Sequence, residues 1–127
     1  MSSVADHTAL TSFVETPIFG QVLVDDYARD RRFLAVPTVS LMEATRAADT
    51  SSGELADLLR RRVVIKVVDL DADLAVRIGS HIPVTGTQAD WPLVAPVVWV
   101  ANNLDIGVLT SQPRLYNGYG VRVVPMP

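Results

Sequence analysis

The stretch SSVADHTAL, residues 2–10, predicts how the rest of the chain is arranged. Its first half is small and apolar and ends at Asp6, which is typical of a short strand followed at once by a helix. In a parallel α/β sheet the carboxyl ends of the strands meet at one edge, and ligands bind in the crevice outside it. If this strand is central, Asp6 lies in that crevice. The alternative is that Asp6 only caps the helix that begins at His7.

Segments typical of strands and of helices alternate along the rest of the chain. Apolar runs stopped by Pro or Gly predict strands, and apolar residues spaced by three and four predict helices. We therefore expect one domain, residues 1–127, of the α/β class: three α/β/α layers around a central, mostly parallel sheet of about five strands. After the first strand, the expected strands cover residues 33–36, 63–68, 106–110 and 120–124, and the expected helices cover 7–14, 17 to about 32, 38–48, 54–61, 71–79 and 89–103.

The composition excludes several classes of protein. The chain has 127 residues, of which 49% are hydrophobic and 20% charged, which favours a folded domain with a core. It has no cysteine, so disulfides, thiolate metal sites and cysteine nucleophiles are excluded. The net charge of -3 provides no overall basic field for nucleic acid. No signal pattern or membrane-spanning run is present, so we expect a cytoplasmic protein that does not bind a membrane.

Three acids stand at comparable places relative to the expected strands. Asp6 follows the first strand, Glu43 lies one turn into the helix after the second, and Asp90 begins the helix before the fourth. Clustered carboxylates repel one another unless a hard cation neutralises them, and Mg²⁺ prefers such oxygen ligands. Each acid also has a simpler interpretation, because residues 40–43 and 87–90 match the capping-box pattern at a helix start.

Four segments, taken in order, resemble the motifs of the PIN-domain family of metal-dependent nucleases. The resemblance implies that Asp6, Glu43 and Asp90 hold Mg²⁺ or Mn²⁺ and are catalytic, with metal-activated water hydrolysing the RNA phosphodiester. The fourth acidic position of the family is occupied here by Gln112, which offers an amide oxygen but no charge. The four segments are residues 4–10, 36–44, 89–95 and 106–112.

The resemblance leads to two functional hypotheses, and a third does not depend on it. The first is a ribonuclease similar to the toxin of a bacterial toxin–antitoxin pair, with an antitoxin protein as partner and a homodimer as a possible assembly. The second is a PIN-like domain that has lost catalysis and serves as a binding or assembly module. The third is an unrelated doubly wound domain that binds a small molecule, although no glycine-rich phosphate loop is present.

Further residues are assigned supporting roles in the ribonuclease hypothesis. Thr8, Thr110 and Gln112 support the metal site, and arginines contact RNA phosphates, because such contacts provide much of the affinity for nucleic acid. The segment YNGYG, residues 116–120, is interpreted as a turn rather than as part of the site. The arginines assigned to RNA binding are Arg114, Arg29 and Arg32.

Overall fold

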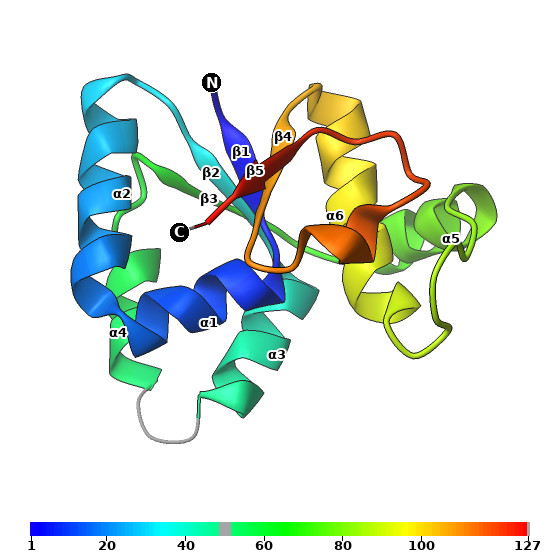
Figure 1. Cartoon of the computed structure of the whole chain (residues 1–127), viewed down its shortest axis with the longest axis horizontal. Coiled ribbons are helices and arrows are strands. Elements are labelled where there is room, and N and C mark those ends of the chain that lie inside the picture. The colour runs from blue at the N-terminus through cyan, green and yellow to red at the C-terminus, as the bar shows by residue number, and fades with distance from the viewer. Residues whose placement is uncertain (49–51, 127) are drawn as a thin grey trace.

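The computed structural model describes residues 1–48 and 52–126, and its centre is a five-stranded sheet. The strand order is β3-β2-β1-β4-β5, and every neighbouring pair is parallel. The first strand is therefore central, with the second and fourth beside it (Figure 1). This confirms the predicted fold class. The strands are β1 (Ser3–Ala5), β2 (Leu34–Pro37), β3 (Ile65–Val68), β4 (Gly107–Thr110) and β5 (Val123–Pro125).

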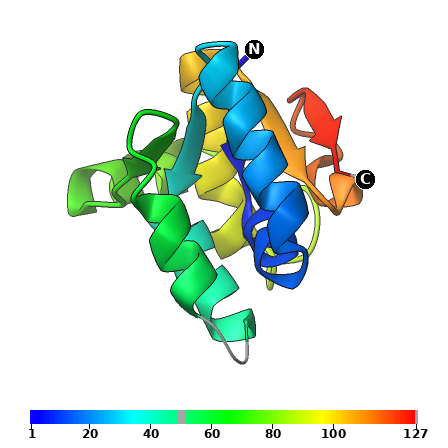
Figure 2. The ribbon, with the colours of Figure 1, turned by 90° about the vertical axis from the view of Figure 1, so that its left-hand side faces the viewer.

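Helices cover both faces of the sheet, which makes three layers (Figure 1). Seen from one side, α2 and α4 run across the face nearest the viewer, whereas α6 lies behind the sheet (Figure 2). The carboxyl ends of the strands form the lower edge of the sheet in Figure 1, where α1 and α3 begin. The helices are α1 (His7–Glu15), α2 (Pro17–Arg29), α3 (Thr38–Ala47), α4 (Ser52–Leu59), α5 (Ala72–His81) and α6 (Trp91–Leu104).

Two apolar cores lie on opposite faces of the sheet, because side chains of a strand alternate in direction. In β1, Ala5 joins the core under α1, α2 and α4, whereas Val4 joins the core under α6. In β4, Leu109 joins the core under α1, α2 and α4, and Val108 joins the core under α6. Burial on both faces explains why the central strands read as continuous apolar runs rather than as alternating ones.

The helix α6 is the most apolar part of the second core. Its residues 94–98 are all buried, and Pro96 lies inside the helix. Within residues 1–48 and 52–126, however, no helix has the length and apolar character needed to cross a membrane.

The structure corrects several predicted boundaries. β3 begins at Ile65 rather than at residue 63, because the amides of Val64 and Ile65 donate to the Arg61 carbonyl and close a turn. β5 is shorter and later than predicted, at Val123–Pro125. A 3-10 helix, η1 (Pro113–Tyr116), occupies a segment for which the sequence predicted no helix. The sequence also predicts a break at residues 49–53 between the helices expected at 38–48 and 54–61; of this break, residues 49–51 lie outside the described residues, and α4 begins at Ser52.

Candidate site at the carboxyl edge of the sheet

The sheet reverses its order of growth at β1, so the crevice between β1 and β4 is the expected ligand site of such a fold. Asp6 follows β1 and residues 111–112 follow β4, which brings both segments to this crevice. The Asp6 amide donates to the Leu109 carbonyl at 3.2 Å and fixes their separation. The amino end of α6, with Asp90, lies at the same edge of the sheet (Figure 1).

Asp6 is fully buried, and both of its carboxylate oxygens accept hydrogen bonds from the protein. Oδ1 accepts from the Thr8 hydroxyl at 2.6 Å and from the Ala9 amide at 2.9 Å. Oδ2 accepts from the Tyr116 hydroxyl at 2.8 Å. Asp6 is therefore the N-cap of α1, as one of the two sequence interpretations predicted.

The residues predicted to support the site continue this network of hydrogen bonds. The hydroxyls of Thr8 and Thr110 are 3.0 Å apart, and both residues are buried. The Ser111 amide donates to the Thr8 hydroxyl, and the Gln112 amide donates to the Thr110 hydroxyl, each at 3.0 Å. The start of α1 and the end of β4 are thus joined through side chains, whereas the Gln112 side chain itself is exposed.

Glu43 is held by a neighbour on its own helix. Its carboxylate forms an ion pair with Arg46 one turn later and accepts from the Arg46 Nε at 3.0 Å. The hydrogen bond from Arg46 lowers the pKa of Glu43 below its usual value. The predicted capping box at residues 40–43 is wrong, because α3 begins at Thr38 and Glu43 turns to Arg46 instead.

Asp90 makes a local contact of a different kind. Its Oδ2 accepts from the Thr87 hydroxyl at 2.8 Å, and its amide donates to the same hydroxyl at 3.2 Å. One half of the capping-box pattern is present, because the Asp90 amide bonds the Thr87 hydroxyl, whereas the Asp90 carboxylate bonds that hydroxyl rather than the Thr87 amide. Asp90 makes no side-chain bond to the amides of α6. Asp90 is partly exposed, in contrast to Asp6.

The three predicted acids share an edge of the sheet but do not form a group. Within residues 1–48 and 52–126, no set of three or more His, Cys, Asp or Glu side chains lies close enough to hold a metal ion. Mg²⁺ keeps several waters when it binds a protein. Asp6 has no solvent exposure and accepts three hydrogen bonds, so the surroundings of Asp6 do not fit a hydrated cation.

A cavity of about 590 Å³ lies beside this network, between the start of α6, the loop before it and η1. Its walls are held by hydrogen bonds across the chain. The Tyr119 hydroxyl donates to the Pro83 carbonyl at 2.9 Å, and the Thr85 hydroxyl donates to the Asn117 carbonyl at 2.9 Å. Gly118 has a φ of 86° and lies against Thr85, so a side chain at this position would be strained.

Three polar side chains that line this cavity have no hydrogen-bond or ion-pair partner within the described residues. Gln112, Arg114 and Asn117 are exposed, and their side chains make no hydrogen bond or ion pair within the part of the chain that the structure describes. The rings of Trp91 and Tyr119 also line the cavity. The indole of Trp91 donates to the Ile82 carbonyl at 3.0 Å, which fixes its position. The cavity therefore combines two aromatic rings that are positioned by hydrogen bonds with amide and guanidinium groups that are available to a ligand.

The other two arginines predicted to bind RNA lie at the opposite edge of the sheet. Arg32 donates to the Met1 carbonyl, pairs with Asp30 and stacks on a tyrosine ring, all near the amino ends of β1 and β2. Arg29 pairs with Asp26 at the end of α2. The structure therefore does not bring Arg29 and Arg32 together with Arg114.

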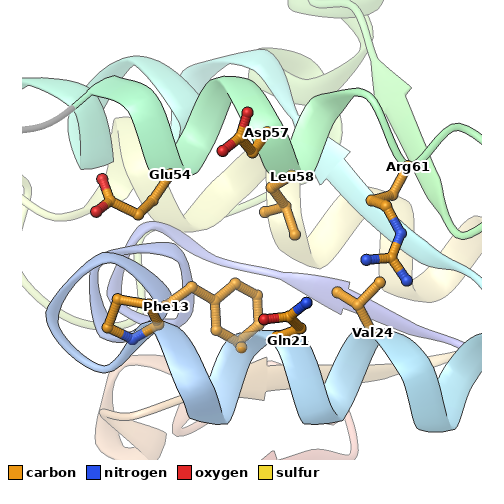
Figure 3. A pocket seen from close by; sticks show the side chains of 9 residues that line it. Phe13, Gln21, Val24, Glu54, Asp57, Leu58 and Arg61 are labelled. Atoms are coloured by element: carbon orange, nitrogen blue, oxygen red, sulfur yellow. The ribbon is translucent and has the colours of Figure 1, made fainter.

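A second cavity, of about 200 Å³, opens between α2 and α4 (Figure 3). Phe13, Val24 and Leu58 provide its apolar wall, and the close approach of Gly20 to Phe13 leaves no space for a side chain there. On its rim, the Arg61 guanidinium pairs with an aspartate of α2. This α2–α4 groove shares no lining residue with the cavity at the carboxyl edge.

Sequence reasoning missed Tyr116, the residue that completes the surroundings of Asp6. The two residues are 110 positions apart, and Tyr116 was interpreted as the start of a turn. The only signal was its place a few residues after a predicted strand of the same crevice. No protein-family model matches this sequence, and no curated protein matches it. Membership of the PIN family thus stays a prediction from the four motifs.

Proposed function

We propose that this chain is a catalytically degenerate PIN-like module that binds single-stranded RNA in the cavity beside Asp6. The observation that carries the proposal is a contrast at one edge of the sheet. Asp6, the first predicted catalytic acid, is buried, and both of its carboxylate oxygens accept hydrogen bonds from the protein. Gln112, Arg114 and Asn117, which line the cavity, are exposed and have no side-chain partner among residues 1–48 and 52–126. The edge is therefore better suited to holding a ligand than to metal chemistry.

The side chains of the cavity suit the groups that unpaired RNA displays. Arg114 offers a guanidinium for a phosphate, and the amides of Gln112 and Asn117 offer donors and acceptors for the edge of a base. Trp91 and Tyr119 offer rings for stacking, which contributes to binding of single strands whatever their sequence. Because the chain has a net charge of -3, few phosphates are contacted and binding is weak.

Fluorescence anisotropy with a labelled single-stranded RNA, in EDTA, tests the proposal. We expect binding without metal, and Arg114→Ala weakens it about tenfold because a charged hydrogen bond to phosphate is lost. Arg29→Ala is the matched control, since it removes the same charge at the opposite edge of the sheet. Equal affinity of both variants, or no binding at all, would contradict the proposal.

The alternative is the metal-dependent ribonuclease predicted from the motifs, with Asp6, Glu43 and Asp90 as catalytic metal ligands. The observation in its favour is that the three acids lie at the same edge of the sheet. Calorimetric titration with Mn²⁺ separates the two functions. Binding that Asp6→Asn and Asp90→Asn both abolish, together with RNA cleavage, would establish the ribonuclease and refute the degenerate module.

An antitoxin-like partner, a homodimer and a cytoplasmic location all stay predictions. The α2–α4 groove supports a protein partner, because it opens between two helices and Ile18 and Val22 of α2 are exposed apolar residues. Light scattering of the wild type and of Gln21→Arg, which places a long charged side chain in the groove from an exposed lining position, tests self-association. A dimer that Gln21→Arg leaves intact would place the interface elsewhere.

A further inference from the structure

We infer that the Tyr116 hydroxyl takes the position beside Asp6 that a divalent cation would occupy in a metal-dependent enzyme. In this chain, an internal donor thereby replaces the metal and joins η1 to the central strand. The inference does not depend on RNA binding, because it concerns only how Asp6 is satisfied.

Asp6 accepts three hydrogen bonds, two of them from residues of α1. The Thr8 hydroxyl and the Ala9 amide both bond Oδ1, as expected for the N-cap of a helix. Without Tyr116, Oδ2 would be a buried acceptor with no partner, which is costly for a carboxylate. A cation or a hydrogen-bond donor from elsewhere in the chain must therefore complete the site, and Tyr116 does so at 2.8 Å.

Tyr116 occupies the space beside Oδ2 of Asp6. Tyr116 is only 3% exposed, and its ring packs into the core under α6. The phenol therefore lies where the waters of a Mg²⁺ ion would have to stand, since that ion dehydrates reluctantly. A cation can reach Oδ2 only if the ring leaves.

Backbone hydrogen bonds on both sides of Tyr116 hold it in place. The segment after β4 folds into η1 with Pro113 in its first turn, and the Leu115 amide donates to the Gln112 carbonyl at 3.1 Å. At the other end, the Tyr119 amide donates to the Tyr116 carbonyl at 3.2 Å. The backbone on both sides thus fixes the ring over Asp6, and the contact belongs to the folded core.

Thermal unfolding of the full chain, with and without about 5 mM Mn²⁺, tests this inference. The Tm of the wild type is expected not to change with Mn²⁺. Tyr116→Ala melts at a lower temperature, and Mn²⁺ raises its Tm by about 5 °C, because the vacated space lets the ion reach Asp6. Adding Asp6→Asn to Tyr116→Ala abolishes that rise.

Two further variants are matched controls. Tyr116→Phe removes the donor but keeps the ring, so it loses stability without gaining a response to Mn²⁺. Tyr27→Ala truncates a tyrosine that is equally buried but bonds the Ser3 hydroxyl, and it is also expected to show no response. If Tyr116→Ala does not fold without metal, Tyr116→Leu takes its place because it preserves apolar contacts.

Two results would overturn the inference. One is a rise in the Tm of the wild type with Mn²⁺ that Asp6→Asn abolishes, since the ring would then not exclude the ion. The other is the absence of any response in both Tyr116→Ala and Tyr116→Leu. RNA binding is measured separately by anisotropy, so failure of the binding proposal is distinguishable from failure of this one.

Discussion

The segment that follows β4 has two sides, and they differ in whether their polar groups find hydrogen-bond partners within the protein. On the inner side, the Ser111 amide and the Tyr116 hydroxyl belong to the network around Asp6, and both carboxylate oxygens of Asp6 have a partner. On the outer side, Gln112 and Arg114 line a cavity, and their side chains make no hydrogen bond or ion pair within the described part of the chain. A single segment therefore stabilises the fold through one face and remains open to a ligand through the other.

The largest effect is expected when Asp6 is compared with Asp90. Asp6→Ala leaves the Thr8 and Tyr116 hydroxyls and one amide buried without an acceptor, which costs about 3–5 kcal/mol of the free energy of unfolding. Asp90→Ala removes one partly exposed contact with Thr87 and costs less than about 1 kcal/mol. Urea denaturation measures both values. Similar losses would show that the two acids play equivalent roles.

A smaller effect is expected for the two buried tyrosines. Tyr116→Phe removes a hydrogen bond to a carboxylate and costs about 2–3 kcal/mol, since bonds to charged groups are the stronger ones. Tyr27→Phe removes a bond to the Ser3 hydroxyl and costs about 1 kcal/mol. The same denaturation measurement applies. If Tyr27→Phe lowers the free energy of unfolding as much as Tyr116→Phe does, the hydrogen bond to Asp6 is no stronger than the one to Ser3.

The pH dependence of stability sharpens this comparison. Burial, and then the charge of Asp6 and the hydrogen bond to it, raise the pKa of Tyr116 above its ordinary value. The unfolded chain loses this proton near the ordinary value of about 10, whereas the folded chain keeps it. The contribution of Tyr116 is therefore complete below about pH 10 and falls as the pH rises further. Above that pH, the Tm of the wild type should fall more steeply with pH than the Tm of Tyr116→Phe. Parallel plots of Tm against pH for the two proteins would contradict this.

The smallest effect is expected at Glu43. The Arg46 hydrogen bond lowers the pKa of Glu43, so the stabilisation by the ion pair is present at neutral pH and is lost as the pH falls below the ordinary value of about 4.3. The Arg46 side chain is 72% exposed, so solvent screens the pair and Glu43→Gln should barely change the midpoint of denaturation at pH 7. A large loss at neutral pH would indicate that Glu43 has a role beyond this pair.

The sequence by itself determined the layered α/β fold and made Asp6 a candidate cap of the first helix. Both depend on local patterns: the apolar runs that make β1 and β4 strands, and the aspartate directly before α1. It also placed Asp6 and the end of β4 at one edge, because the carboxyl ends of parallel strands meet there. It failed at residues 113–116, where no apolar period marks the short helix η1.

Only the tertiary structure decided what each acid at that edge contacts. Glu43 turned to Arg46 on its own helix, and Asp90 turned to Thr87, so neither approached Asp6 closely enough to form a metal group within residues 1–48 and 52–126. The partner of Asp6 came from Tyr116, 110 residues away. Such a contact leaves no local pattern in the sequence, because its geometry depends on how the sheet, α6 and η1 pack together.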